Sequence, residues 1–341
     1  MTHYRFLFPV GQGGFALEKI KEFVIVYDCG SITSNSMVES CIDLVSSYID
    51  HVDLLFISHF DKDHVNGIRY LLSKVRVRTA IVSWIAPKLR YAYGIYTDGA
   101  YTAMMDILND NEVEVTHVGG QEMEQRSFNH NDIWEWIAKS MLTPEDFDKI
   151  NKQIENDGIS LPRLKTDLKY LEEKKDDINN AFKQAFGSKG PNSKGLIVLS
   201  QRCYDSTDLY TRLFKCWPIS YGYLPMPCVY RNFKNEWKES SCLYVGDADL
   251  KNAKKNSIVK NFVSNNLRER QLFLMQIPHH GSFDNIEANF ENDYPAQMYL
   301  LNDDNTDRLQ RSKKLYQSLT SQDKLIVAQV RFDMYYTKTD L

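Results

Sequence analysis

The sequence lacks several features that would place it in familiar protein classes. No apolar run in its 341 residues approaches the ~20 needed to cross a bilayer. The first residues show no basic start, apolar core and small-residue cleavage site of a signal peptide. The six cysteines include no C-x-x-C pair, and there are no internal repeats or low-complexity tracts. We therefore expect a cytoplasmic globular protein with free thiols and no membrane contact.

An excess of positive charge is also missing. The formal net charge is −4, which argues against a large non-specific nucleic-acid footprint. One local basic cluster, Arg76, Arg78, Lys88 and Arg90, is interleaved with aromatic residues in a pattern that suits phosphate contact and base stacking. We interpret it as a charged edge strand and a surface loop, with the nucleic-acid contact as the alternative.

The most informative stretch of the chain is rich in metal-binding side chains. His59, Asp61, Asp63 and His64 follow directly on the apolar run 53–57. Imidazole nitrogen and carboxylate oxygen bind Zn²⁺, Mn²⁺ or Fe at neutral pH. The pattern predicts a metal site in the loop after a buried strand.

Two further apolar strands end in side chains of the same kind. Asp247 follows the strand-like run 241–245, and the pair His279-His280 follows the run 273–277. Histidine is scarce, with eight in the chain, so an adjacent pair carries more information than a single acid. We expect the three strand ends to converge on one edge of a layered sheet.

These motifs resemble the metallo-β-lactamase superfamily, in particular the branch typified by the hydrolase domain of the DNA-uptake channel protein ComEC and by phosphorylcholine esterase. The resemblance covers residues 10–282 in family order. It rests on Val10-Gly11-Gln12-Gly13-Gly14, Asp28-Cys29-Gly30, the His59–Gly67 motif, Asn192–Val198, Gly246-Asp247-Ala248 and Pro278-His279-His280-Gly281-Ser282.

The chain departs from the family pattern at a few positions. Gly14 replaces the usual Asp, and Gly195 stands near a usual Ser. Asp61 replaces the second His of most members, as the ComEC-like branch tolerates. A further His ligand has no obvious match, and His117 and His130 are the only candidates for it. We interpret His117 as a structural residue of a strand and His130 as a solvated loop residue, and the sequence leaves open whether either completes the site.

The resemblance implies a four-layer αββα sandwich with a binuclear centre of two divalent metal ions, Zn²⁺ or Mn²⁺. By position His59 and Asp61 would hold one ion, and Asp63 and His64 the other. Asp247 would bridge the two ions. His279 or His280 would complete the ligand set, and the sequence leaves open which of the two does so.

Other roles follow from the same resemblance. Asp63, His279 and His280 are the catalytic candidates, the last two because the histidine that is not a ligand could contact the substrate or protonate its leaving group. Asp28 is expected to orient a ligand. Ser282 and Asn192 are the remaining candidates for substrate or supporting contacts. We interpret Asp249 as a solvated acid in a polar turn.

Alternating strands and helices predict one α/β domain over residues 1–341. Strands are expected at 4–8, 15–27 and 53–57, and helices at 37–50 and 65–73. Between about 132 and 189 the pattern turns polar and helical, beginning at Ile133, Trp134 and Ile137. We predict a helical insertion that lies over the site or contacts a second copy or a partner protein. The aromatic, Pro-rich residues 203–240 are expected to form loops.

The function that fits best is a metal-dependent hydrolase, a phosphodiesterase or nuclease that uses metal-activated water on DNA or RNA. A phosphodiesterase of a small cyclic or signalling nucleotide is the alternative within enzymes. A ligand-sensing or regulatory module on the same fold is the alternative outside them. The sequence leaves open whether the substrate is a polymer or a small molecule.

Overall fold

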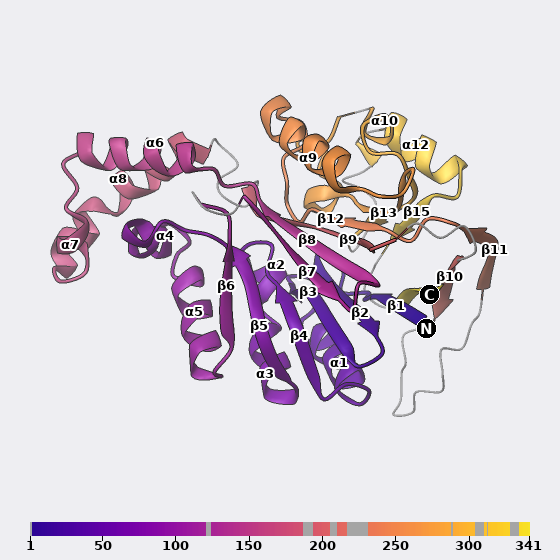
Figure 1. The fold of residues 1–341 in the computed structure, drawn as a ribbon. Coiled ribbons are helices and arrows are strands. Elements are labelled where there is room, and N and C mark those ends of the chain that lie inside the picture. The colour runs from indigo at the N-terminus through magenta and orange to yellow at the C-terminus, as the bar shows by residue number, and fades with distance from the viewer. Residues whose placement is uncertain are drawn as a thin grey trace.

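The computed structural model describes residues 2–120, 124–186, 194–204, 210–216, 231–287, 289–303, 310–311, 313–327 and 334–341. Two sheets pack face to face, and helices cover the outer face of each (Figure 1). The predicted α/β class and the four-layer αββα sandwich are confirmed. The N- and C-terminal ends lie close together, because the first and last described strands pair with each other.

The first sheet has the strand order β11-β10-β16-β1-β2-β3-β4-β5-β6. Strands β3 to β6 run parallel to one another, and the remaining pairs are antiparallel. The strands are β1 Thr2–Leu7, β2 Gly13–Ile20, β3 Phe23–Ser31, β4 His51–Phe56, β5 Arg76–Ser83, β6 Glu114–Val118, β10 Thr211–Cys216, β11 Arg231–Trp237 and β16 Met334–Asp340.

The second sheet has the order β15-β14-β13-β12-β9-β8-β7. Strands β12 to β15 are parallel, and β7 to β9 add an antiparallel half. The strands are β7 Gln125–His130, β8 Trp134–Ser140, β9 Leu196–Arg202, β12 Cys242–Tyr244, β13 Leu272–Gln276, β14 Ala296–Leu301 and β15 Leu325–Val327.

The helices form the two outer layers and one projecting group (Figure 1). Those on the first sheet and beside it are α1 Asn35–Ser46, α2 Lys62–Val65, α3 Ile68–Lys74, η1 Pro87–Leu89, α4 Arg90–Tyr96 and α5 Ala100–Asp110. Those of the second sheet are α9 Ala253–Asn266, η3 Pro278–Gly281, α10 Phe290–Asp293 and α12 Lys313–Ser321. The projecting group is α6 Pro144–Asn156, α7 Leu161–Leu164 and α8 Leu168–Phe186, and we call it the insertion.

The apolar core has three parts, as four layers require. Between the sheets, Tyr27 and Phe56 of the first sheet pack with Trp134, Trp136 and Phe273 of the second. The other two parts lie between each sheet and its own helices. Burial of this apolar surface is the main force that holds the layers together.

The start of the insertion differs from the expectation. Trp134 and Ile137 belong to strand β8 and not to a helix. Trp134, Trp136 and Ala138 alternate along the strand and enter the core between the sheets, and this burial outweighs the helix-like spacing. The helices themselves run from 144 to 186, within the predicted range.

Three other segments also differ. The expected strand over 15–27 is the hairpin of β2 and β3, which turns at Lys21 and Glu22. The expected helix over 65–73 is two short helices, α2 and α3. The expected loop over 203–240 contributes β10 and β11 to an edge of the first sheet, while 205–209 and 217–230 lie outside the described residues. None of the helices in the described ranges is both long and apolar enough to cross a membrane.

Candidate metal centre

The predicted site residues meet where parallel strands end. His59, Asp63 and His64 follow β4, Asp247 follows β12, and His280 follows β13. The carboxyl ends of these strands face the same edge of the two sheets, the usual position of ligand sites in α/β folds. The three segments, far apart in sequence, therefore form one cluster, which we call the histidine cluster: His59, Asp63, His64, Asp247 and His280.

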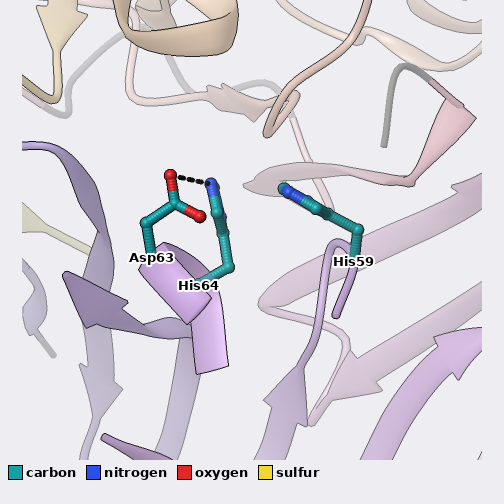
Figure 2. Close-up of side chains that lie close together, drawn as sticks. All are labelled: His59, Asp63 and His64. Carbon is teal, nitrogen blue, oxygen red and sulfur yellow. Dashed lines mark ion pairs between the residues drawn. The ribbon is translucent and has the colours of Figure 1, made fainter. Parts of the chain in front are cut away.

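Figure 2 shows the part of this cluster that the first motif supplies. Asp63 and His64 rise from α2, and the ring of His59 points toward them from the loop after β4. Ligand atoms of these three buried residues lie within 4.8 Å of one another, and so do those of His64, Asp247 and His280. Each group could hold a metal ion, and the two share His64.

Asp247 lies at the centre of the cluster. Its Oδ1 is 3.4 Å from His64 Nε2 and 3.7 Å from His280 Nε2. Its Oδ2 is 3.7 Å from the Nε2 atoms of both His59 and His279. One carboxylate thus presents one oxygen to each of two histidine pairs, which is the arrangement that a bridging ligand requires.

The opposite nitrogens of three imidazoles are held by hydrogen bonds. His280 Nδ1 donates to the backbone carbonyl of Asn302 (2.6 Å), His64 Nδ1 bonds Asp28 Oδ2 (2.7 Å), and His59 Nδ1 bonds Ser58 Oγ (2.9 Å). In their neutral form these imidazoles carry the proton on Nδ1, and the lone pair of each Nε2 then faces a carboxylate oxygen. Because lone pairs repel one another, a proton or a metal cation must lie between them. Partners that fix a histidine tautomer in this way are typical of metal sites.

Several of the facing atoms have no hydrogen bond. Within the described residues, Nε2 of His59, Nε2 of His64 and Oδ1 of Asp247 are buried and lack a partner. Buried polar atoms are nearly always paired, so such a group needs an explanation. A set of imidazole and carboxylate donors is the one that divalent Zn or Mn takes, and the residues therefore fit a metal centre.

The local charges support the same conclusion. Burial would lower the pKa of His64, but the carboxylates of Asp28 and Asp247 outweigh it and raise that pKa well above its ordinary value. Burial would raise the pKa of Asp247, but the surrounding imidazoles hold it well below its usual range. For Asp63, burial likewise opposes the hydrogen bond from His280 and the charge of His64, which lower its pKa to about 2. The cluster therefore favours bound cations.

The backbone is strained at the same place. Asp28, His279 and His280 have φ of 52°, 49° and 52°, in the left-handed region that residues other than glycine rarely adopt. Such strain costs on the order of 1–3 kcal/mol per residue and persists where the surrounding structure enforces it. All three of these strained residues are ones that the sequence already marked as site candidates.

The two adjacent histidines have different environments. His280 is 3% exposed, and its Nε2 is 3.0 Å from Asp63 Oδ2. The side chain of His279 is 38% exposed and lines the adjacent pocket. The geometry places His280 inside the cluster and His279 at its open side. The sequence alone did not distinguish the two histidines.

A pocket of about 500 Å³ opens beside the cluster. This volume lies in the range of small-molecule sites, roughly 300–1,000 Å³. The residues that line it are Gln12, Ile32, Phe60, Asp61, Lys62, Asp63, Thr97, Asp98, Ala100, Asp247, His279 and Asn285. Asp61 therefore faces the pocket, and burial raises the pKa of its carboxyl.

The remaining candidates have mixed outcomes. Asp28 is fully buried and accepts hydrogen bonds from the backbone N–H and the hydroxyl of Ser58 besides its bond to His64. Ser282 donates its backbone N–H to His279, and its side chain is not part of the pocket lining. Asn192 lies outside the described residues.

Sequence reasoning missed Asn285. This residue is 1% exposed and lines the pocket, and its Oδ1 is a buried acceptor without a hydrogen-bond partner among the described residues. An Asn in a polar loop is too common to single out from sequence. Its position three residues after Ser282 is the only signal that could have marked it.

The interpretation of Asp249 was wrong. Its side chain is 9% exposed, and its Oδ2 lies 3.4 Å from Lys255 Nζ, so it belongs to a buried ion pair. His117 lies in β6 beside Arg90, consistent with a structural role. His130 ends strand β7 and stacks on Phe23, so it is not a loop residue.

Gly14 also has a structural reason. A Cβ at this position would lie 2.9 Å from the Cβ of Asp28 and 3.1 Å from Nδ1 of His64. Real Cβ contacts are essentially never shorter than 3.0 Å. The bond between Asp28 and His64 thus occupies the space that a side chain at residue 14 would need, which explains why this chain has Gly there.

The four basic residues interpreted from sequence as a charged edge strand and a surface loop, with nucleic-acid contact as the alternative, lie in separate places. Arg76 begins β5 and pairs with His51 at the amino end of β4, opposite the end that leads to the site. Arg78 Nη1 bonds Asp53 Oδ1 at 2.5 Å. Arg90 bonds the carbonyl of Ile85. These arginines do not form a single basic groove with the pocket.

No family model matches the chain, and no curated protein matches it. Among solved structures, it is similar to the metallo-β-lactamase fold protein YhfI from Bacillus subtilis, with 9% identity over 97% of this chain and 98% of that chain and a TM-score of 0.45. It is also similar to the chemotaxis sensor ODP in a peroxy diiron state, with 18% identity over 42% of this chain and 52% of that chain and a TM-score of 0.28. A diphosphatase of the PhnP family shares 10% identity over 40% of this chain and 56% of that chain, with a TM-score of 0.26.

The match spans about half the length of the chemotaxis sensor chains. Further similar structures also carry the metallo-β-lactamase name. These similarities concern the fold and not the activity.

Proposed function

We propose that this protein is a metal-dependent hydrolase that cleaves phosphodiesters. The observation that carries the proposal is the histidine cluster, in which buried lone pairs of imidazoles and carboxylates face one another around Asp247. His64, Asp63 and His280 would hold one divalent cation, and His59 with Asp61 the other, with Asp247 between them. Cations held in this way supply a water of lowered pKa and offset the charge of a phosphoryl group.

The residues around the cluster have distinct tasks in this proposal. The Asp28 carboxylate holds the proton on Nδ1 of His64, so that the lone pair of Nε2 stays available to bind a metal ion. The backbone carbonyl of Asn302 does the same for His280. These contacts fix ring orientations before any substrate arrives, which is the preorganisation that catalysis needs.

His279 is the candidate general acid. It lies on the pocket side of the cluster, and its Nε2 is 3.7 Å from Asp247 Oδ2. A proton on Nε2 is within reach of a leaving oxygen that sits beside Asp247. Lys62 lines the same pocket with an exposed side chain, and its ammonium group would attract a phosphate.

The phosphodiester bond is common to DNA, RNA and small nucleotides, so the cluster is compatible with each as a substrate. The carboxylates around Asp247 favour hard cations as the bound metal, since carboxylate ligands suit Mn²⁺ as well as Zn²⁺. Such cations are suited to binding phosphate oxygens. A regulatory module on the same fold would bind metal and nucleotide without turnover, which the following experiment distinguishes.

The test is metal content together with hydrolysis of bis-p-nitrophenyl phosphate by the full chain. Elemental analysis should find about two Zn, Mn or Fe per chain after reconstitution, as in two-metal hydrolases. A chelator should abolish hydrolysis, and Zn²⁺ or Mn²⁺ should restore it. Protein that takes up no transition metal would overturn the proposal. Metal-loaded protein that hydrolyses nothing would also overturn it and would favour the regulatory module instead.

Asp247→Ala should reduce hydrolysis by more than about 100-fold, because loss of a central ligand exceeds the 10–100-fold effect of an outer partner. Asp249→Asn is the matched control, since it lies in the same buried turn and its Oδ2 pairs with Lys255. It should keep metal and activity while lowering stability. Equal activity of Asp247→Ala and wild type would mean that Gly246-Asp247 is only a turn.

A further inference from the structure

One wall of the pocket is formed by a turn outside the histidine cluster. Thr97, Asp98 and Ala100 line the pocket from the junction of α4 and α5, together with metal-side residues such as Asp63 and His279. We call residues 97–100 the wall turn. Thr97 Oγ1 donates to the carbonyl of Tyr93 and accepts from the N–H of Tyr101, so the turn is tied to both helices.

The insertion supports this wall. Helix α8 packs against α4, with the ring of Phe182 stacked on Tyr96 at 4.9 Å between centroids. Phe182 also contacts Tyr93 at 5.9 Å and is fully buried. Lys175 of α8 pairs with Asp98 of the wall turn at 3.3 Å. The position of the wall turn therefore depends on the insertion.

The same aromatic residues reach the metal-binding loop. Phe60 lies between His59 and Asp61 in sequence, is 3% exposed, and packs edge-to-face against Tyr101 at 5.1 Å and Tyr93 at 6.5 Å. Packed aromatic residues have little freedom to shift. The distance between the wall turn and the metal side of the pocket is thus set by one continuous cluster.

The charge around the pocket favours one phosphate and not many. Lys62 is the single Lys or Arg among the lining residues that the structure describes, whereas Asp61, Asp63, Asp98 and Asp247 are acidic. A nucleic-acid strand carries a phosphate at every nucleotide, and proteins that bind it neutralise several of them. The side chain of Asp98 is 92% exposed at the wall. Its pair with Lys175 is an exposed one and therefore weak, so the carboxylate would still face a flanking phosphate.

We propose that the insertion-supported wall turn limits this site to small phosphodiesters of nucleotide size and excludes nucleic-acid strands. Ile32, Phe60 and Ala100 give the pocket an apolar side for the organic group of such a substrate. Asn285 Oδ1, which has no hydrogen-bond partner in the described part of the chain, would accept from a hydroxyl or amino group of the substrate. This inference rests on the proposed hydrolase function and specifies its substrate class.

The test compares metal-loaded full-length protein on a dinucleotide and on a single-stranded oligonucleotide. The wild type should prefer the dinucleotide by at least about tenfold in kcat/KM, the discrimination that a shaped pocket provides. Cleavage of the oligonucleotide at the same or a higher kcat/KM would overturn the size limit while leaving the hydrolase proposal intact. Failure to cleave either substrate would contradict the hydrolase proposal itself.

Two variants test the wall directly. Phe182→Leu should loosen the support and reduce the preference for the dinucleotide, whereas Phe147→Leu should not. Phe147 is buried in the same insertion, and its ring packs edge-to-face against Trp84, whereas the ring of Phe182 packs against Tyr93 and Tyr96 of α4. Equal preferences in the two variants would overturn the role of the insertion.

Asp98→Asn keeps the test valid even if Phe182→Leu fails to fold, because Asp98 is exposed. It should raise kcat/KM for the oligonucleotide by about two- to fivefold, the effect of one exposed charge, and change kcat/KM for the dinucleotide by less than that. Asp106→Asn is the matched control, an exposed acid of α5 outside the pocket lining. The same gain in both variants would indicate a general charge effect and refute a role of the wall.

Discussion

Two buried clusters in the described ranges combine histidine with carboxylate, and they use their polar atoms differently. The first, between the sheets, is centred on Glu18, which is fully buried. We call it the inter-sheet cluster. The donors to the Glu18 carboxylate are His3 Nε2 (3.0 Å), Arg5 Nε (2.7 Å), Trp136 Nε1 (2.9 Å), Ser200 Oγ (2.6 Å) and Tyr244 OH (2.8 Å).

In the inter-sheet cluster the acid meets proton donors. The charge of Glu18 is balanced by Arg5, and together with the hydrogen bonds this overcomes the burial that would raise its pKa, so the pKa lies well below its usual range. The donors come from both sheets, so the cluster links the two halves of the sandwich. The Glu18 carboxylate is therefore fully paired, and within this cluster Nδ1 of His3 is the one buried side-chain atom without a hydrogen-bond partner among the described residues.

In the histidine cluster the acid lies among imidazole nitrogens that are not all paired. Asp28, Ser58 and Asn302 occupy the Nδ1 atoms of the imidazoles, and the Nε2 atoms converge on Asp247. Within the described residues, Nε2 of His59, Nε2 of His64 and Oδ1 of Asp247 have no hydrogen-bond partner there. The two clusters contain similar residue types at similar burial. The contrast teaches that the direction of the donors, and not the composition, separates a structural cluster from a ligand site.

The largest effect expected from this contrast is on stability. Glu18→Gln removes the charge that balances Arg5 and leaves a buried guanidinium without its counter-ion. We expect the free energy of unfolding to fall by about 3–5 kcal/mol, with metal content unchanged. Urea unfolding of reconstituted protein measures the first quantity, and elemental analysis the second.

The control for this variant is Glu22→Gln, since Glu22 is 88% exposed in its pair with Lys19 and such pairs contribute little. It should change stability by less than about 0.5 kcal/mol. If Glu18→Gln lost its metal but kept its stability, the inter-sheet cluster would be part of the metal site. The distinction between a structural cluster and a metal-binding one would then be wrong.

The two clusters also differ in how well the sequence alone predicts them. The ligands of the site follow directly on apolar strands, so Ile57, Val245 and Ile277 mark where His59, Asp247 and His279 must emerge. Parallel strands then bring these ends together without further information. Local patterns were therefore enough to predict most of the histidine cluster.

The inter-sheet cluster has no local pattern. Glu18 lies 182 residues from Ser200 and 226 from Tyr244. A lone acid in a strand looks solvent-facing until the opposite sheet is placed. The error at Asp249 has the same origin, because its partner Lys255 lies in the following helix and the burial of both depends on tertiary packing.

The second prediction returns to the histidine cluster. Asp28→Asn should weaken metal affinity by about 10–100-fold, as expected for loss of a carboxylate that orients a ligand histidine. The amide cannot reliably keep the proton on Nδ1 of His64, whereas asparagine tolerates the left-handed backbone at this position. Titration with a competing chelator measures the affinity.

Stability of the metal-free Asp28→Asn protein should fall by less than that of Glu18→Gln. A large loss of metal affinity with a small loss of stability is what a positioning residue gives, whereas a structural residue gives the reverse. A variant that binds metal as tightly as the wild type would mean that Asp28 only fills space beneath Gly14 and His64.

The smallest effect concerns pH and His3. Burial lowers the pKa of His3 to about 4, although the Glu18 hydrogen bond opposes the shift. The folded protein therefore keeps His3 neutral while the unfolded chain, with its ordinary value of 6.5, takes up a proton. Stability should then be fully present above pH 6.5 and be lost as the pH falls toward 4.

The slope from this one group is about 1.4 kcal/mol per pH unit inside that window. His3→Gln keeps a donor for Glu18 but cannot titrate, so the difference between the two unfolding curves isolates the histidine. With wild type and variant measured metal-free, contributions of the histidine cluster cancel. Parallel pH profiles of the two proteins would show that His3 is already charged in the folded state, and the inter-sheet cluster would then hold two cations against one acid.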